Sequence, residues 1–578
     1  MLRVTDHKQR SFFDAAYLVT DQREFEFARF YAREILPLVT DRDFIAFYPE
    51  AGREAVSPAL LFHCSVLAKI EGLSDRKASK AVKTRLDWKV ALDLRVDDPG
   101  FDSTRLVRFR SRFLERTSAN AQGPASDEEE ERVRLLFDRV VDKLCDYDLI
   151  KRDQAIRLDS THVQSAAKNI NRYQTIFESM KLAVRALDIE DRRVLDAEAL
   201  ALLREKYSKP LGAYDLKKDR VRKNLEVAAK DALRLLSVLA GNSHRGLREL
   251  HAVKVLEQAV RDNVELRRRG VKRKPGRPKK DAQTDSLSEA DIASLFEPGG
   301  LSTEGVAVVE RQSGDRMITP HDESARLGVK KGGKLRWVGS KLHAAETVPE
   351  KRGEPSFVVD FNMTPANVPD VVETLPSQAR LQRRGFSPPR LYVDKGYVSG
   401  ETVAKSRDEY NTELYGPPAE PRTTGRFQPE QFSVDFDVES ATCPAGKVCD
   451  SFTRRYEGET FAGADARFNK ATCSGCPLAG QCLGKGQAAR TVSFTAHHHD
   501  LVQQREKART PEFKKDYKKR APGEGIFADL AGPLGLRRSS VKGPVKTLFE
   551  HSLGLVAVNV KRFFKALQRQ PRVVPMRA

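Results

Sequence analysis

Apolar residues in the N-terminal part of the chain recur at the three- and four-residue spacing of helices that are buried on one side. Ser57-Pro58 forms a helix start, with Ser as the cap and Pro in the first turn. One apolar stripe then follows: Leu60, Leu61, Cys64, Leu67 and Ala68. Gly72 is typical of a helix end, and Ser74 begins a second helix. The pattern predicts a compact helical region over about residues 21–116 that contains a helix-turn-helix.

The second helix of this pair is strongly basic. Arg76, Lys77 and Lys80 lie within one turn of each other, as on a helix that reads DNA. A further helix, expected from Ser103 to Glu115, is also basic. The alternative is a plain helical hairpin in a bundle whose charged side is only solvated. The pattern leaves both interpretations open.

A polar linker and another helical stretch lead into a different pattern. Ile156 to Val163 is a short run of strand formers that carries Asp159. From Asn169 to about Pro298 helical spacing returns in two long stripes. They comprise Leu225, Ala229, Ala232, Leu236 and Leu239, and Leu250, Val253, Leu256, Val260 and Val264. Both stripes predict structural helices, paired as a hairpin.

Strand patterns return from Val306 onward. Leu335 to Ala345 and Ser356 to Phe361 are apolar strands, and a helix is expected to begin within 365–370. Leu391 to Val393 is another short strand, followed at once by Asp394. Strands, a helix and a further strand predict an α/β sheet. The last helix starts at Pro544 and has a broad apolar face that should pack on this sheet.

Composition adds a partner to this picture. The 578 residues carry a formal net charge of +20 and are 40% hydrophobic. Such a basic excess favours a polyanion, and nucleic acid fits best. No apolar run is long enough to cross a bilayer and no secretion signal is visible, so a cytoplasmic protein without a membrane partner is expected.

A proline-broken basic tract extends from Arg267 to Lys280. Its Pro-Gly-Arg-Pro core, with Arg273 and Arg277, resembles an AT-hook, which places an extended Arg segment in the minor groove of A·T-rich DNA. A flexible basic linker is the alternative.

Five of the seven cysteines lie between Cys443 and Cys482. The Cys473/Cys476 spacing is that of a zinc knuckle, and Cys443 and Cys482 are the expected other ligands of a structural Zn²⁺. Cys449 is the reserve ligand. An unmetallated thiol cluster remains the alternative.

Three acidic residues stand out as candidate chemistry. Asp159 and Asp394 lie on or next to short strands, and Glu524 lies near a basic helix. An acid on a core strand is costly to bury without a cation or water. Together the three carboxylates suggest a composite site for a divalent metal.

These stretches together resemble the DDE transposases of bacterial insertion sequences, in the group with an InsH-type helical N-terminal domain. The matching blocks are Asp159-Ser160-Thr161, Gly339 to His343, Pro365 to Asp370, Asp394 to Tyr397, and the spaced set Tyr517, Arg520 and Glu524. The resemblance covers most of the chain except the helical insert after Asn169. Two positions depart from the family pattern. A Lys expected seven residues after Glu524 is Ala531, with Arg537 and Arg538 as nearby substitutes, and Pro522-Gly523 interrupts the expected helix.

The resemblance implies an α/β, RNase H-like catalytic core. It also implies two Mg²⁺ or Mn²⁺ ions held by Asp159, Asp394 and Glu524, which would cut DNA at the element's ends and join them to target DNA. Tyr517, Arg520 and Lys395 would contact the end DNA. The implied partners are double-stranded DNA, both terminal inverted repeats and target, and a second copy in a synaptic homodimer. A bacterial, nucleoid-associated location follows.

Six segments are expected on this basis. They are a helical N-terminal DNA-binding domain (1–117), a linker, helix and first catalytic strand (118–169), a helical insert with the basic tract (170–300), the RNase H-like core (301–408), a cysteine-rich insert (409–508) and C-terminal core helices with the catalytic Glu (509–578). Two other functions compete with an active transposase. One is a transposase-derived DNA-binding protein that has lost its chemistry, which Ala531 keeps open, and the other is an RNase H-like nuclease without strand transfer.

Overall fold

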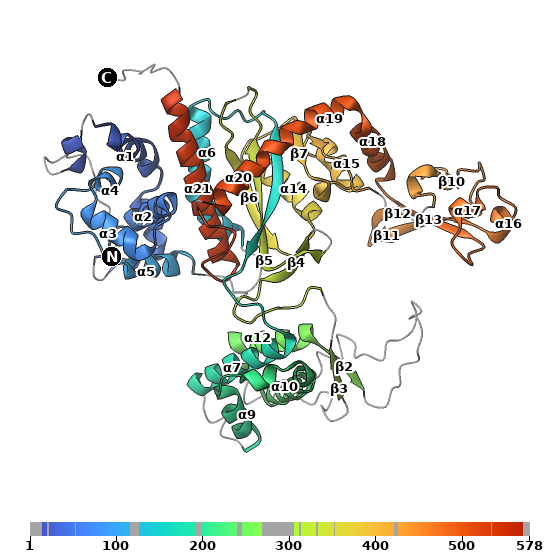
Figure 1. Ribbon diagram of the computed structural model, residues 1–578, viewed down its shortest axis with the longest axis horizontal. Coiled ribbons are helices and arrows are strands. Elements are labelled where there is room, and N and C mark those ends of the chain that lie inside the picture. Colours follow the sequence, from blue (N-terminus) through green and yellow to red (C-terminus); the bar gives the residue numbers. More distant parts are fainter. Residues whose placement is uncertain are drawn as a thin grey trace.

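The computed structural model places the helical N-terminal region, a central mixed sheet, a helical insert and a cysteine-rich module along one chain (Figure 1). It describes residues 14–19, 22–51, 54–115, 126–190, 198–239, 245–268, 306–310, 314–330, 333–351, 353–420, 426–532 and 534–569. Arg273 and Arg277 of the basic tract lie outside these residues. No helix within the described ranges combines the length and apolar character needed to cross a membrane.

The central sheet confirms the predicted α/β class. Strand β5 pairs with both β4 and β6 along one edge and with β1 along the other, all antiparallel, while β7 and β8 extend the sheet beyond β1 in parallel. The strands are β1 (Ile156–Gln164), β4 (Arg326–Lys330), β5 (Leu335–Thr347), β6 (Val358–Pro365), β7 (Arg390–Val393) and β8 (Glu413–Tyr415). The start of β1 is buried on both faces, as expected for a central strand.

Helices cover this sheet and close its core. They are α6 (Asp127–Asp146), α14 (Thr374–Arg383), α15 (Gly400–Asp408), α18 (His498–Arg509), α19 (Pro511–Tyr517), α20 (Glu524–Ala531) and α21 (Pro544–Arg569). The acidic start of α6 forms a capping box between Ser126 and Glu129. Helix α21 packs on α6 and β6, and its Asn559 side chain bonds both backbone groups of Val358. The expected helix near 365–370 begins only at Asp370, as a 3₁₀ turn, because β6 continues through Pro365.

The predicted helix pair in the N-terminal region is confirmed. Helix α2 (Pro58–Glu71) is capped by Ser57 and ends at Gly72, which has a left-handed φ of 69°. Helix α3 (Asp75–Thr84) follows. The other helices here are α1 (Glu26–Phe30), α4 (Leu86–Ala91) and α5 (Thr104–Phe113).

The N-terminal helices and the sheet share one hydrophobic core. Helix α2 packs on α21, and the rings of Phe30 and Phe563 meet edge to face with centroids 5.1 Å apart. Phe62 lies similarly close to Phe549, at 6.0 Å. The first and last helices of the chain therefore stabilise each other.

The two long apolar stripes form a separate helical unit with its own core, below the sheet in Figure 1. Its helices are α7 (Arg172–Glu190), α9 (Glu198–Ser208), α10 (Lys218–Leu239), α11 (Arg245–Arg248) and α12 (His251–Asn263), followed by the pair β2 (Val264–Arg268) and β3 (Val306–Glu310). Leu236 of α10 and Leu256 of α12 are buried in this core, as predicted.

The cysteine-rich module projects from the opposite end of the molecule to the N-terminal helices (Figure 1). It contains β9 (Ser433–Asp435), β10 (Ser440–Thr442), β11 (Ser451–Glu457), β12 (Thr460–Phe468), α16 (Lys470–Cys473), α17 (Ala479–Cys482) and β13 (Arg490–Thr495). Its hydrophobic core is small, and Cys443, Cys449, Cys473 and Cys482 pack against it.

The shared core predicts that the N-terminal helices and the sheet unfold together. Phe563→Ala removes a buried ring and should lower the free energy of unfolding by about 3–5 kcal/mol. Trp88 of α4 and Trp337 of β5 are the only two tryptophans, so single-tryptophan variants report separately on the two parts during denaturant unfolding. Both probes should shift by the same amount, whereas the exposed neighbour change Lys565→Ala should shift neither. Independent midpoints for Trp88 and Trp337 would contradict a shared core.

Candidate functional site

Asp159, in the middle of β1, lies beside Asp394, which directly follows the parallel strand β7. Strands β1 and β7 pair in the register Leu158 with Val393, so the next residue on each strand is an Asp. A backbone amide donates to each carboxylate, from Ser160 to Asp159 at 2.8 Å and from Lys395 to Asp394 at 2.6 Å. Two of the three predicted acids are thus brought together from positions far apart in the sequence.

The electrostatics of Asp159 reflect this crowding. Burial raises its pKa above the ordinary range, and the neighbouring charge of Asp394 raises it further. Arg520 opposes both effects, because its Nη2 donates to Asp159 Oδ2 at 2.8 Å, with both side chains at least four-fifths buried. Lys330 also stabilises the ionised form. Cations therefore partly compensate the repulsion between the acids.

Tyr517 and Arg520 both bind the strands that carry the acids. The Tyr517 hydroxyl donates to the backbone carbonyl of Val393 at 2.9 Å, and burial raises its pKa to about 12. Its ring stacks on Phe513 with centroids 5.6 Å apart. This anchors the end of α19 on the end of β7. The expected DNA contacts of Tyr517 and Arg520 stay predictions.

Glu524 begins α20 directly after the 3₁₀ turn Lys518–Gly523, and that turn packs on β1 and β7. Arg157 of β1 donates to the carbonyl of Lys519 at 3.3 Å, which fixes the turn to the strand. Pro522 lies inside the turn, so the predicted interruption is confirmed and Tyr517 and Glu524 belong to different helices. The backbone of Glu524 thus follows a segment packed on both acid strands, while its side chain lies outside the described residues.

The donor set suits a hard divalent cation. Carboxylate oxygens from Asp159 and Asp394 are the ligands that Mg²⁺ and Mn²⁺ prefer. Among the side chains that the structure describes, no group of three His, Cys, Asp or Glu is arranged to hold a metal. Glu524, whose side chain lies outside the described residues, stays the predicted third ligand.

A second polar group near Asp159 was not predicted as part of the site. The Ser160 hydroxyl donates to Asp370 at 3.3 Å, and Lys341 binds the same carboxylate at 2.6 Å. Lys330 Nζ lies 3.5 Å from Ser160 Oγ. The alternation of Lys341 and His343 on this strand was the available sequence signal, since residues two apart share one face.

Ala531, at the position of the missing Lys, is the last residue of α20. Its expected substitutes Arg537 and Arg538 run beside Gln164, at the far end of β1 from Ile156, where the Gln164 amide donates to the Arg537 carbonyl at 2.8 Å. Gln164, their neighbour on β1, is five residues along the strand from Asp159.

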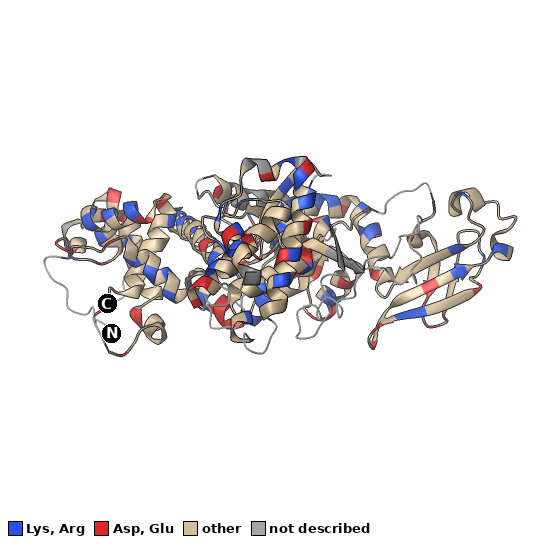
Figure 2. Cartoon of the chain, turned by 90° about the horizontal axis from the view of Figure 1, so that it is seen from below, with Lys and Arg blue, Asp and Glu red and all other residues tan. Residues whose placement is uncertain are grey.

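Four of the basic residues predicted to contact DNA are exposed. Arg76, Lys77 and Lys80 line the outer side of α3, whose other side is buried, and Lys395 is exposed beside Asp394. Figure 2, which views the molecule from below Figure 1, shows Lys and Arg interspersed with acidic residues over its helices and strands. The structure thus leaves these cations accessible to a partner.

The four predicted zinc ligands are free thiols that influence one another electrostatically. Burial raises the pKa of Cys482, and the charges of Cys473, Cys443 and Cys476 add to that effect. Two of the cysteine positions lie in tight turns with a left-handed glycine. Gly446 follows Cys443, and Gly475 lies between Cys473 and Cys476. The described thiols nevertheless do not form a ready metal-holding group.

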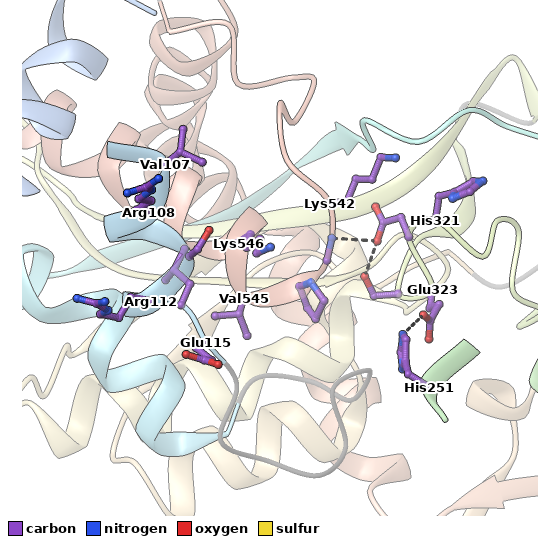
Figure 3. Close-up of a pocket in the computed structure, with 16 residues that line it drawn as sticks. Val107, Arg108, Arg112, Glu115, His251, His321, Glu323, Lys542, Val545 and Lys546 are labelled. Carbon is purple, nitrogen blue, oxygen red and sulfur yellow. Dashed lines mark hydrogen bonds and ion pairs between the residues drawn. The ribbon is translucent and has the colours of Figure 1, made fainter. Parts of the chain in front are cut away.

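A cavity of about 700 Å³ lies where the N-terminal helices, the helical insert and α21 meet (Figure 3). Arg108 and Arg112 line it from α5, and Lys542 and Lys546 line it from the start of α21. On the insert side His251 pairs with Glu323 at 3.0 Å. None of the three candidate acids lines this cavity.

Two segments of the chain match known protein families. Residues 442–564 match the family "Transposase DDE domain". This segment includes all five clustered cysteines but neither the strand that carries Asp159 nor the strand before Asp394. Residues 23–112 match "Transposase domain (DUF772)", which covers α2, α3 and most of α5. No curated protein and no solved structure matches the chain.

The Arg520–Asp159 ion pair predicts competition with a metal for the same carboxylate. Arg520→Ala should tighten Mn²⁺ binding to the DNA-free protein about tenfold, because one nearby positive charge and its hold on Asp159 are lost. Arg520→Lys should stay close to the parent chain, as should Lys514→Ala on an exposed part of α19. Calorimetric titration measures the affinity, and weaker binding by Arg520→Ala would refute the competition.

Proposed function

We propose that this chain, whose two matched segments are both transposase domains, is a DDE transposase of the insertion-sequence type that cuts DNA at the ends of an insertion sequence and joins them to target DNA. The observation that supports this most directly is the pairing of β1 with β7, which sets Asp159 beside Asp394. Glu524, at the start of the helix that follows the packed 3₁₀ turn, is the third acid. The mixed sheet and the DDE-domain match support an RNase H-like core.

Asp159, Asp394 and Glu524 would hold Mg²⁺ or Mn²⁺. When bound, such ions activate a water or 3′-hydroxyl and stabilise the departing oxygen at phosphorus. Arg520 favours the ionised form of Asp159 in the DNA-free protein, and its planar guanidinium can bind a phosphate through two hydrogen bonds. Tyr517 holds the end of β7 in place through Val393, which keeps Asp394 in register.

DNA recognition is divided between separate parts of the chain in this proposal. The exposed side of α3, with Arg76, Lys77 and Lys80, reads the element ends. The tract around Arg273 and Arg277 adds sequence-tolerant or A·T-leaning contact, and Lys395 contacts a phosphate near the cut. Two copies would hold the two ends in a homodimer. In the cysteine-rich module, Cys443, Cys473, Cys476 and Cys482 would bind a structural Zn²⁺.

Replacement of any one acid tests the function. Asp159→Asn, Asp394→Asn and Glu524→Gln should each reduce nicking and joining by about a thousandfold or more, because a metal ligand is lost while shape is kept. The substrate is duplex DNA copied from the borders of the element that encodes the chain, incubated with Mg²⁺. Binding of this DNA should change little in all three variants.

The exposed Glu512→Gln, on α19, is the matched control and should keep full activity. Full activity in Asp159→Asn or Asp394→Asn would reject the assignment. Nicking without joining by the parent chain would favour the nuclease, and end binding without cleavage would favour the inactive, transposase-derived protein that Ala531 suggests.

The zinc proposal predicts about one Zn²⁺ per purified full-length chain, measured by elemental analysis. Cys473→Ser and Cys476→Ser should lose the metal and loosen the module, since its own hydrophobic core is small. Cys145→Ser, far from the cluster in sequence and on α6, should retain it. A metal-free protein whose folding a chelator leaves unchanged would show that the cysteines are thiols only.

A further inference from the structure

The hairpin of β4 and β5 folds back over β1 beside the acid site. Gly339 makes this possible, because an added Cβ would lie 2.1 Å from the Val163 carbonyl oxygen. Gly328 likewise leaves room for Trp337, whose ring would lie 2.3 Å from a Cβ there. The Trp337 ring then lies against His162 of β1 in a tilted arrangement, with centroids 5.6 Å apart. The fold-back carries the end of β4 to the middle of β1.

Lys330, the last residue of β4, is the charged group that this hairpin delivers. Its Nζ lies 3.5 Å from Ser160 Oγ, one residue from Asp159. Its charge also stabilises the ionised form of Asp159 and so lowers the pKa of that carboxyl. Lys330 as a whole residue is only partly buried.

Two of the nearby carboxylates already have cationic partners. Asp370 is bound by Lys341 at 2.6 Å, with the Lys341 side chain 7% exposed, and Asp159 is bound by Arg520 at 2.8 Å. The Ser160 hydroxyl donates to Asp370, which leaves its lone pairs to accept from Lys330. Within the described part of the chain, Lys330 therefore has a neutral hydroxyl as its polar partner and no carboxylate within salt-bridge distance. Its positive charge is available to an anion.

We propose that Lys330 binds a backbone phosphate of the DNA strand that enters the site of Asp159 and Asp394. The inference rests on the proposed function and adds a substrate-contacting residue to it, held in place by Ser160, Asp370 and Lys341. A flexible ammonium group fits this task, since it neutralises a phosphate as a point charge and carries no sequence information. A metal cation is excluded as its ligand by like charge.

The test neutralises the protein cation and the DNA phosphate separately and together. Lys330→Ala, Lys330→Arg and the control Lys334→Ala, an exposed Lys of the same hairpin, are compared with the parent chain. The DNA is the border duplex with one phosphate at a time replaced by a neutral methylphosphonate around the cut. Affinity is measured without Mg²⁺ at several salt concentrations, and cleavage is measured in single-turnover reactions with Mg²⁺.

Lys330→Ala should weaken binding about tenfold and reduce the salt slope by about one. At one position of the scan, the methylphosphonate should weaken binding by the parent chain and Lys334→Ala but leave Lys330→Ala unchanged, because the two neutralisations remove the same contact. Lys330→Arg should restore the sensitivity. Ser160→Ala should keep the salt slope and weaken binding less than Lys330→Ala, since the charge remains but is less well held.

Two results would overturn the inference. In the first, Lys330→Ala binds the unmodified DNA as tightly as the parent chain does. In the second, each methylphosphonate of the scan weakens binding by Lys330→Ala as much as binding by the parent chain. The scan needs no cleavage. A parent chain that binds the border DNA without cutting it would therefore refute the proposed function while the scan still decides the role of Lys330.

Discussion

Repulsion between the carboxylates of Asp159, in the middle of β1, and Asp394, directly after β7, is the constraint on which the candidate site depends. The β1–β7 register fixes Asp159 and Asp394 next to each other, and burial makes the negative charge of Asp159 costly. Two cations partly compensate this charge: Arg520 binds Asp159, and Lys330 lies next to Ser160. Both cations can also bind phosphate, so the groups that make the site stable without DNA are those suited to receive it.

The surrounding fold keeps these charges in place. Arg157, buried on β1, binds Glu346 of β5 at 2.7 Å and also holds the turn before Glu524, which couples strand pairing to the segment that carries Glu524. Tyr517 likewise ties the end of α19 to the end of β7 through the carbonyl of Val393. Because α21 packs on both α2 and the sheet, the helices that carry the DNA-reading candidates are not independent of this frame. The cysteine-rich module, by contrast, has a core of its own.

Local signals in the sequence predicted much of this fold. Ser57, Gly72 and Pro544 marked helix ends correctly because caps depend on neighbouring residues. Asp159 and Asp394 were found because an acid on an apolar strand contradicts its surroundings. Lys330 could not be found this way, since its position depends on a hairpin folded at Gly339 and on contacts between residues 170 positions apart. The partners of Arg520 and Tyr517 were missed for the same reason.

The central claim is that Asp159 and Asp394 form a metal-dependent site for DNA, with Arg520 passing from carboxylate to phosphate. A crystal structure of the full chain with border duplex DNA and Mn²⁺, read by anomalous scattering, tests it most directly. The account predicts a manganese peak that touches both aspartates and Glu524, with Arg520 moved from Asp159 onto a DNA phosphate. A peak elsewhere, or Arg520 still bound to Asp159 in the DNA complex, would contradict it.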